Sequence, residues 1–202
     1  MSTFRFVCLV LWGSTFLAAA QGQNPVTVKK INFSLDNIPE YVTSGGNNKA
    51  QGGVSSAQKW VVMEVEFETS PEWVNEVTFE VFLLIQNGNQ QFNIEGSGVY
   101  QDIEKGQSHK IALYLSPQTY KRYSGVSTQQ AIKDVAVKVT LGGALVDTYS
   151  DKMRRGGGAN RRWWELVAPQ RAILRTLKDT PWYAIYSGYY EQLKPNQNPN
   201  AQ

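Results

Sequence analysis

The chain is almost without cysteine and histidine. Among its 202 residues it has one cysteine, Cys8, and one histidine, His109. Cys8 lies in an apolar N-terminal run, so the rest of the chain has no thiol for a disulfide or for a metal site. Without a second histidine, neither a Ser-His-Asp triad nor a histidine-based metal site is indicated. We therefore predict no catalytic residues, no metal and no cofactor, and a protein that is not an enzyme.

Long hydrophobic runs are also lacking, apart from one near the start. Arg5 precedes an apolar run over residues 6–17, and small residues with an A-x-A-like site follow it. This order is typical of a secretory signal peptide, here residues 1–22, cleaved after Ala20 or Gly22. The run is shorter than the roughly 20 apolar residues that a membrane-spanning helix needs. We expect an exported bacterial protein, periplasmic or outer-membrane-associated, with no transmembrane segment in the mature chain.

Helical periodicity is scarce over residues 23–151, where apolar and polar residues instead alternate with period two. Such alternation predicts half-buried strands. The fold class is therefore all-β, an immunoglobulin-like antiparallel β-sandwich of about seven strands with a C-terminal arm containing a short helix; the alternative is an open barrel. The predicted strands are residues 26–35, 60–69, 77–85, 92–100, 109–115, 134–141 and 144–150.

Local signals refine this prediction. The stretch from Ser70 to Trp73, which contains Pro71, predicts a turn that ends the second strand. The pair Gly142-Gly143 predicts a tight hairpin. The apolar residues of the first strand change phase near Lys29, which indicates a bulge or a strand shared between two sheets. Residues 117–125 predict a short helical turn.

Charge is unevenly distributed along the chain. Residues 23–151 hold 10 Lys/Arg and 14 Asp/Glu, a balance of −4, whereas residues 152–202 hold 9 and 3, a balance of +6. Residues 152–162 form a basic, Gly-rich linker, residues 163–194 an aromatic arm, and residues 195–202 an Asn/Pro/Gln-rich tail that we expect to be disordered. Within the arm, Pro169 is suited to a first helical position, which predicts a helix over residues 170–179.

The aromatic residues of the arm have two interpretations. Each such ring buries about 150–250 Å² when it packs, so the arm is expected to fold back onto an open face of the sandwich. Trp, Tyr and Arg are also the residues enriched at binding hot spots. Some of these side chains are therefore candidates for docking onto a partner. The candidates are Arg161, Arg162, Trp163, Trp164, Trp182, Tyr183, Tyr186, Tyr189 and Tyr190.

One stretch of the arm carries a family resemblance. Residues 177–194, LKDTPWYAIYSGYYEQLK, resemble the C-terminal motif of a small exported family of verrucomicrobial and related bacteria. Members of that family are encoded beside type IV pilus-like secretin and assembly genes. The resemblance implies an Ig-like envelope protein without catalytic residues. Its expected partners are envelope proteins such as pilus or secretin components.

Two other functions remain open. A carbohydrate-binding sandwich would stack sugars on Trp60, Trp73, Trp163, Trp164 or Trp182. A hydrolase would use paired carboxylates from Glu64, Glu66 and Glu68, whose spacing along a strand falls in the range of glycosidase acids. Such a row of acids is more typical of a solvated strand face. Arginines 154, 155, 161 and 162 are suited to phosphate groups, but export argues against nucleic acid as a partner.

Overall fold

The computed structural model describes residues 24–38, 59–150, 162–171 and 173–195. The predicted signal peptide, Arg161 with most of the predicted linker, and all of the predicted tail except Pro195 lie outside these residues. Among the described residues, no helix has the length and apolarity that crossing a membrane requires.

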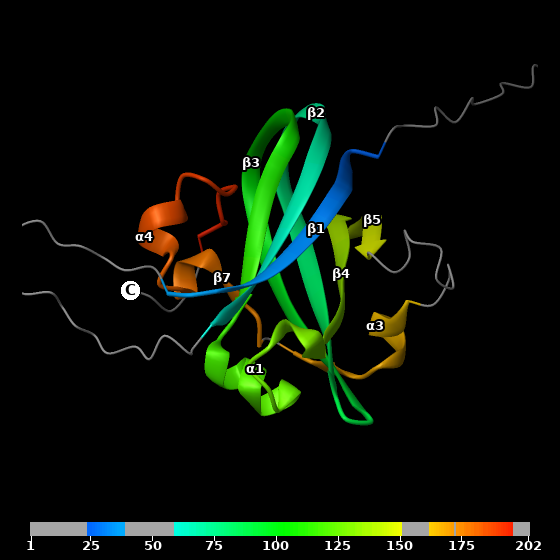
Figure 1. Cartoon of the computed structure of the whole chain (residues 1–202). Helices are drawn as coiled ribbons and strands as arrows, with labels where there is room; N and C mark the ends of the chain where they lie inside the picture. The colour runs from blue at the N-terminus through cyan, green and yellow to red at the C-terminus, as the bar shows by residue number, and fades with distance from the viewer. Residues whose placement is uncertain (1–23, 39–58, 151–161, 172, 196–202) are drawn as a thin grey trace, which may run out of the picture.

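Two long, bent strands organise the fold. They are β2 (Trp60–Asn87) and β3 (Gln90–Leu115), which pair with each other in antiparallel fashion along nearly their whole length. Before its bend, β2 also pairs with β1 (Val26–Asp36), and after the bend it pairs with β4 (Ile132–Leu141). β5 (Ala144–Ser150) pairs with the outer side of β4. One continuous sheet therefore folds over onto itself, which gives the two layers visible in Figure 1.

The core lies between the two layers. The rings of Phe67, before the bend in β2, and Phe79, after it, approach to 4.8 Å between centroids. The inward residues that the alternation predicted in both halves of β2 are all buried, from Val61 to Ile85. The predicted β-sandwich is confirmed.

The structure corrects the strand boundaries. The predicted turn from Ser70 to Trp73 is wrong, because β2 continues through it with register shifts between Phe67 and Thr69 and between Thr69 and Trp73. A bulge tolerates Pro71, which cannot donate to a ladder, so the strand bends without ending. For the same reason, the strands predicted at residues 92–100 and 109–115 are one strand, β3, that follows the bend of β2.

Several local predictions are confirmed. The register of β1 against β2 shifts between Val28 and Lys30, at the predicted phase change. α1 (Pro117–Ser124) occupies the predicted helical turn and ends at Gly125, which has φ 69°. Gly142 and Gly143 both have positive φ, 58° and 83°, in the hairpin between β4 and β5. Such turns favour glycine because other residues rarely adopt this backbone region.

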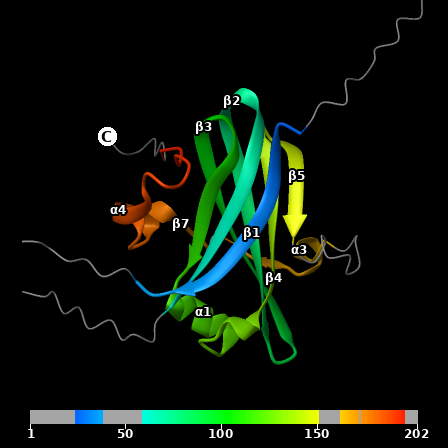
Figure 2. The ribbon, with the colours of Figure 1, turned by 45° about the horizontal axis from the view of Figure 1, so that its top comes forward.

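The arm wraps around the sandwich. It contains α3 (Trp163–Leu166), β6 (Pro169–Gln170), β7 (Arg175–Thr176), the 3₁₀ turn η2 (Leu177–Asp179) and α4 (Tyr183–Tyr186). α3 and α4 lie on opposite sides of the sandwich in both views (Figures 1 and 2). The helix predicted at residues 170–179 is wrong, because β6 and β7 each pair with β3 instead.

Candidate functional site

The first half of the arm is anchored by Trp164. Its side chain is 4% exposed and stacks on Phe82, with 6.3 Å between ring centroids. Its neighbour Trp163 donates from Nε1 to Oδ2 of Asp134 at 2.7 Å. The fully buried Asn93 donates from Nδ2 to the backbone oxygens of Trp164 and Val167, at 3.1 and 3.0 Å. Trp164 is therefore a packing residue, covering the outer face of the second half of β2.

The second half of the arm is anchored by Trp182. This side chain is 5% exposed, meets Trp60 edge-on at 5.5 Å and stacks on Tyr114 at 5.4 Å. Leu177 joins the same small cluster. Between the two anchors, Leu174 is part of the main core, and the arm crosses β3 where Gly96 leaves room for it. The predicted folding back of the arm onto the sandwich is thus realised for Trp164 and Trp182.

The residues that follow Trp182 are, by contrast, exposed. Residues 183–189, YAIYSGY, are all exposed and carry no charge. Four large side chains project from this stretch, and we call them the tyrosine patch: Tyr183 (51% exposed), Ile185 (49%), Tyr186 (39%) and Tyr189 (52%). Contiguous exposed apolar and aromatic side chains of this kind mark interaction surfaces on otherwise polar proteins.

A polar network supports the patch from below. Lys110 donates from Nζ to the Tyr189 hydroxyl at 2.6 Å and lies 3.3 Å from Oε1 of Glu64. Tyr190 donates to Oε2 of the same carboxylate at 3.3 Å. The hydrogen bond to Tyr189 raises the pKa of Lys110, and burial raises that of Tyr190. These contacts fix two of the arm tyrosines to β2 and β3, so the patch stands on a rigid base.

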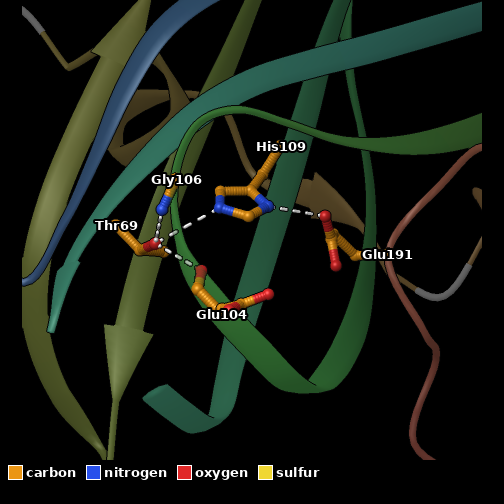
Figure 3. Close-up of polar contacts among 5 residues, drawn as sticks. All are labelled: Thr69, Glu104, Gly106, His109 and Glu191. Atoms are coloured by element: carbon orange, nitrogen blue, oxygen red, sulfur yellow. Dashed lines mark hydrogen bonds and ion pairs between the residues drawn. The ribbon is translucent and has the colours of Figure 1, made fainter. Parts of the chain in front are cut away.

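The end of the arm is held by His109. Nδ1 of His109 lies 2.7 Å from Oε1 of Glu191, and Nε2 lies 3.2 Å from Oγ1 of Thr69 (Figure 3). The Thr69 hydroxyl donates to the backbone oxygen of Glu104 at 2.8 Å and accepts from the Gly106 amide at 3.0 Å. His109 thus links Glu191 at the end of the arm to Thr69 on β2.

Thr69, His109 and Glu191 place a hydroxyl, an imidazole and a carboxylate in a row, as in a catalytic triad, but the hydroxyl is not arranged as a nucleophile. A nucleophile needs its proton directed at the histidine and its oxygen open to a substrate. Thr69 is 5% exposed, and its oxygen has three partners within the fold. What this arrangement does is fasten the arm, because Glu191 also donates its amide to Lys110 O at 2.9 Å. Sequence reasoning missed Thr69 and Glu191, since no local pattern links residues so far apart.

The residues predicted as partner-binding candidates therefore differ in exposure and do not form one surface. Tyr183, Tyr186 and Tyr189 come together on one exposed surface. Trp164 and Trp182 are buried anchors, while Trp163 and Tyr190 are half-buried. Arg162 precedes α3, on the other side of the sandwich, and pairs with Glu165 at 3.2 Å. Sequence reasoning did not include Ile185, which an aromatic count overlooks.

The structure also shows where the residues predicted for hydrolysis and for sugar stacking lie. Glu64 pairs with Lys110, and Glu68 pairs with Lys29 at 2.6 Å. Of the tryptophans proposed for sugar stacking, Trp60, Trp164 and Trp182 are buried, whereas Trp73 is 55% exposed. No group of three or more His, Cys, Asp or Glu suited to a metal ion occurs in the part of the chain that the structure describes.

Comparisons with known proteins agree with this architecture. A protein-family model matches residues 17–197, and the chain belongs to the family that this model defines. A crystal structure of a protein from Akkermansia muciniphila is similar, with a TM-score of 0.67 and 21% identity over 85% of this chain and 94% of that one. At this identity the likeness shows the shared fold.

A beta-glucosidase from Listeria innocua, solved in complex with gluconolactone, has a TM-score of 0.27 and 11% identity over 60% of this chain and 15% of that one. A likeness this low carries no argument about fold or activity. A search of the curated proteins found no match.

Proposed function

We propose that this protein is a non-enzymatic, exported interaction module of the bacterial envelope, an accessory of a type IV pilus-like or secretin assembly. The observation that carries the proposal is the tyrosine patch, a run of seven exposed and uncharged residues held on a rigid base. The centres of protein interfaces are depleted in charge and enriched in tyrosine. The resemblance of residues 177–194 to the C-terminal motif of an exported family encoded beside pilus-like genes supports the choice of assembly.

The build of the arm supports this function. Trp182 and Tyr190 fix the chain on either side of the patch to the sandwich, so the backbone of the patch loses little conformational entropy when it binds. A segment that is ordered before binding gives more affinity for the same buried area. A surface that served only to fold the chain would have its rings turned inward, as Trp164 and Trp182 do.

Carbohydrate binding is the less favoured function. Three of its five candidate tryptophans are buried, and stacking on them would require the arm to leave the sandwich. Trp73 is the one that lies mostly open. A glycan panel read by tryptophan fluorescence of the purified protein tests this alternative directly, because a sugar on Trp73 would change its emission.

The experiment for the proposed function is in-cell crosslinking followed by pull-down of the tagged full chain. We expect the wild type to capture envelope proteins and the Y183A/Y186A variant to lose them, since both side chains are exposed and serve no packing role in the core. Leu145→Ala is the matched control, because Leu145 is 48% exposed on β5, outside the patch. Equal capture by Y183A/Y186A and the wild type would overturn the proposal.

A further inference from the structure

A second candidate surface lies at the end of the sandwich opposite the bend. This end is formed by α1, the 3₁₀ turn η1 (Gln129–Ala131) and the tip of the hairpin that joins β2 to β3 (Figures 1 and 2). The tip and α1 are in contact, because the rings of Phe92 and Tyr123 lie 5.3 Å apart and a Cβ added at Gly125 would lie 3.1 Å from Nδ2 of Asn87. α1 is itself anchored in the core by Tyr120, which is 2% exposed. The side chains at this end therefore stand on one rigid unit.

The two segments that form this end carry positive charge and no acid. Residues 81–94, which contain the hairpin tip, are uncharged, and residues 116–133, which contain α1 and η1, have three cations, Lys121, Arg122 and Lys133. All three are exposed, and none has an ion pair among the described residues. Uncompensated charges of one sign on one face attract ligands of the opposite sign.

The acids that border this end are turned away from it. Asp134 follows Lys133 but is 3% exposed and accepts from Nε1 of Trp163, on the outer face that α3 covers. Asp36 ends β1 on the side of the sandwich where the arm lies, and it accepts from the Ser34 hydroxyl at 2.9 Å. The arm on that flank carries exposed charges of both signs, which are those of Arg175, Lys178 and Asp179.

Amide side chains surround the three cations. Asn87 and Gln90 are exposed register partners, two positions beyond Ile85 and Phe92, so they share the hairpin face that meets α1. In η1, the backbone oxygen of Gln130 accepts from Nζ of Lys133 at 3.0 Å, which directs that lysine toward the turn. We call the resulting set the α1 surface, and its members are Asn87, Gln90, Lys121, Arg122, Gln130 and Lys133.

This composition suits a ligand that has both hydroxyl groups and carboxylates. A primary amide donates and accepts hydrogen bonds, as a sugar hydroxyl does. Lysine and arginine make charge-assisted hydrogen bonds with carboxylates, and Arg122 is positioned for this by the Tyr123 ring, 5.7 Å from its guanidinium carbon. A lipid surface fits less well, because adsorption needs apolar side chains beside the cations. Within the described part of this end, Val126, 43% exposed, is the one large hydrophobic side chain that is open to solvent.

We infer that the α1 surface binds an acidic polysaccharide, with Lys121, Arg122 and Lys133 pairing with its carboxylates and Asn87 and Gln90 bonding to its hydroxyls. This function goes beyond the proposed docking of an envelope protein, since the tyrosine patch lies on the flank and takes no part in it (Figure 1). It also differs from sugar stacking on tryptophan, because the α1 surface has no tryptophan.

Isothermal titration of the full chain at physiological salt tests the inference with three polymers. The probes are polygalacturonate, which has hydroxyls and carboxylates, poly-L-glutamate, which has carboxylates without hydroxyls, and dextran, which has hydroxyls without charge. We expect polygalacturonate to bind at least about fivefold more tightly than poly-L-glutamate, and dextran not to bind.

Matched variants assign the binding to the α1 surface. K121Q/R122Q should weaken polygalacturonate binding about tenfold. K105Q/K178Q, which removes the same charge from two exposed lysines outside the surface, should leave it unchanged. Because Lys121 and Arg122 lie in the last turn of α1, where cations favour a helix, circular dichroism checks folding, and K133Q is the alternative variant. Gln90→Ala should weaken binding about threefold through the loss of a hydrogen bond.

Several results would overturn the inference. They are no binding of polygalacturonate, equal binding of poly-L-glutamate, tighter binding of anionic phospholipid vesicles or of DNA, and equal weakening by K121Q/R122Q and K105Q/K178Q. The proposed function fails separately. If polygalacturonate does not bind while Y183A/Y186A loses its envelope partners, the inference is wrong and the proposed function stands. If K121Q/R122Q loses polygalacturonate while envelope capture does not depend on Tyr183 and Tyr186, the inference stands and the proposed function is wrong.

Discussion

Trp182 and Tyr183 are neighbours in sequence with opposite environments, and truncating each to alanine separates the two roles of the arm. Trp182 is 5% exposed against Trp60 and Tyr114, whereas Tyr183 is 51% exposed. We expect Trp182→Ala to destabilise the fold strongly and Tyr183→Ala to leave its stability nearly unchanged.

The magnitude follows from burial. Removing a buried tryptophan costs about 3–5 kcal/mol, and its two aromatic contacts account for about 0.5–1.5 kcal/mol each within that total. Because Trp182 packs in a small cluster outside the main core, where water can fill the space left by the ring, we place the loss near 3 kcal/mol, which corresponds to a fall in Tm of roughly 6–12 °C for a chain of this size. Surface substitutions such as Tyr183→Ala stay within about 0.5 kcal/mol.

Urea unfolding followed by far-ultraviolet circular dichroism measures both variants, and W182F adds an intermediate step that retains a ring. The expected order of stability is wild type and Y183A together, then W182F, then W182A. Midpoints for W182A and Y183A that both equal that of the wild type would refute the reasoning, because they would mean that burial of Trp182 contributes nothing to stability.

Three further predictions concern the arm and the core. Gly96→Ala should lower the free energy of unfolding by about 1–3 kcal/mol through overpacking, because an added Cβ would collide with the Cβ of Leu174. The control G188A adds a Cβ that meets nothing within 4 Å, and it should leave stability unchanged in the same urea assay. Glu191→Gln should lower the free energy of unfolding by about 1 kcal/mol, because it weakens the contact with His109. It should also accelerate amide hydrogen exchange at Gln101, whose amide donates to the backbone oxygen of Gln192. Unchanged exchange would contradict the role of His109 in holding the end of the arm. Burial raises the pKa of Tyr100 above its unfolded value of 10, so the folded state keeps its full stability with respect to this group below pH 10 and loses stability as the pH rises further. Tyrosinate absorbance near 295 nm should therefore include a late phase that coincides with unfolding. The absence of that phase would contradict the prediction.

The alternation of residues was sufficient to predict the fold class and the inward faces. The pattern from Val61 to Phe67 marks one buried face, and all the residues it assigns to that face are buried. Period-two alternation cannot, however, distinguish two strands joined by a turn from one strand that bends. Pro71 is equally compatible with both, and the choice is made by the pairing of β3 along both halves.

The arm was the harder part, because its conformation is decided by what it contacts. Residues 170–179 carry apolar side chains at helical spacing, but Leu174 reaches the core beside Gly96 from a bend directly before β7. Ile173 and Leu174 donate their amides to the Glu95 oxygen at 3.0 and 3.3 Å, so the edge of β3 replaces the bonds that a helix would have made. The sequence of the arm alone does not contain that edge.

The candidate site, too, depends on contacts between residues that are far apart in the sequence. The predicted list held the aromatic residues of the arm but could not rank them, since exposure depends on the surfaces that Trp60, Tyr114 and Phe82 offer from the sandwich. Thr69 and Glu191 escaped notice because they meet at His109 from segments 122 positions apart in the chain. Local sequence patterns therefore indicate which residue types a segment contains, but they do not predict its contacts with distant segments.

The way the arm is bound decides how its function has to be tested. Deleting it would expose Trp60, Val62, Ala112 and Tyr114 together and would also remove Leu174 from the main core. It would further leave the edge of β3 unpaired, and open edges invite aggregation. Loss of a partner after such a deletion would therefore report unfolding as readily as lost docking. The family model spans sandwich and arm together, over residues 17–197, consistent with a single unit. Substitutions confined to exposed side chains, such as Tyr183, Tyr186 and Trp73, are the perturbations that separate binding from folding.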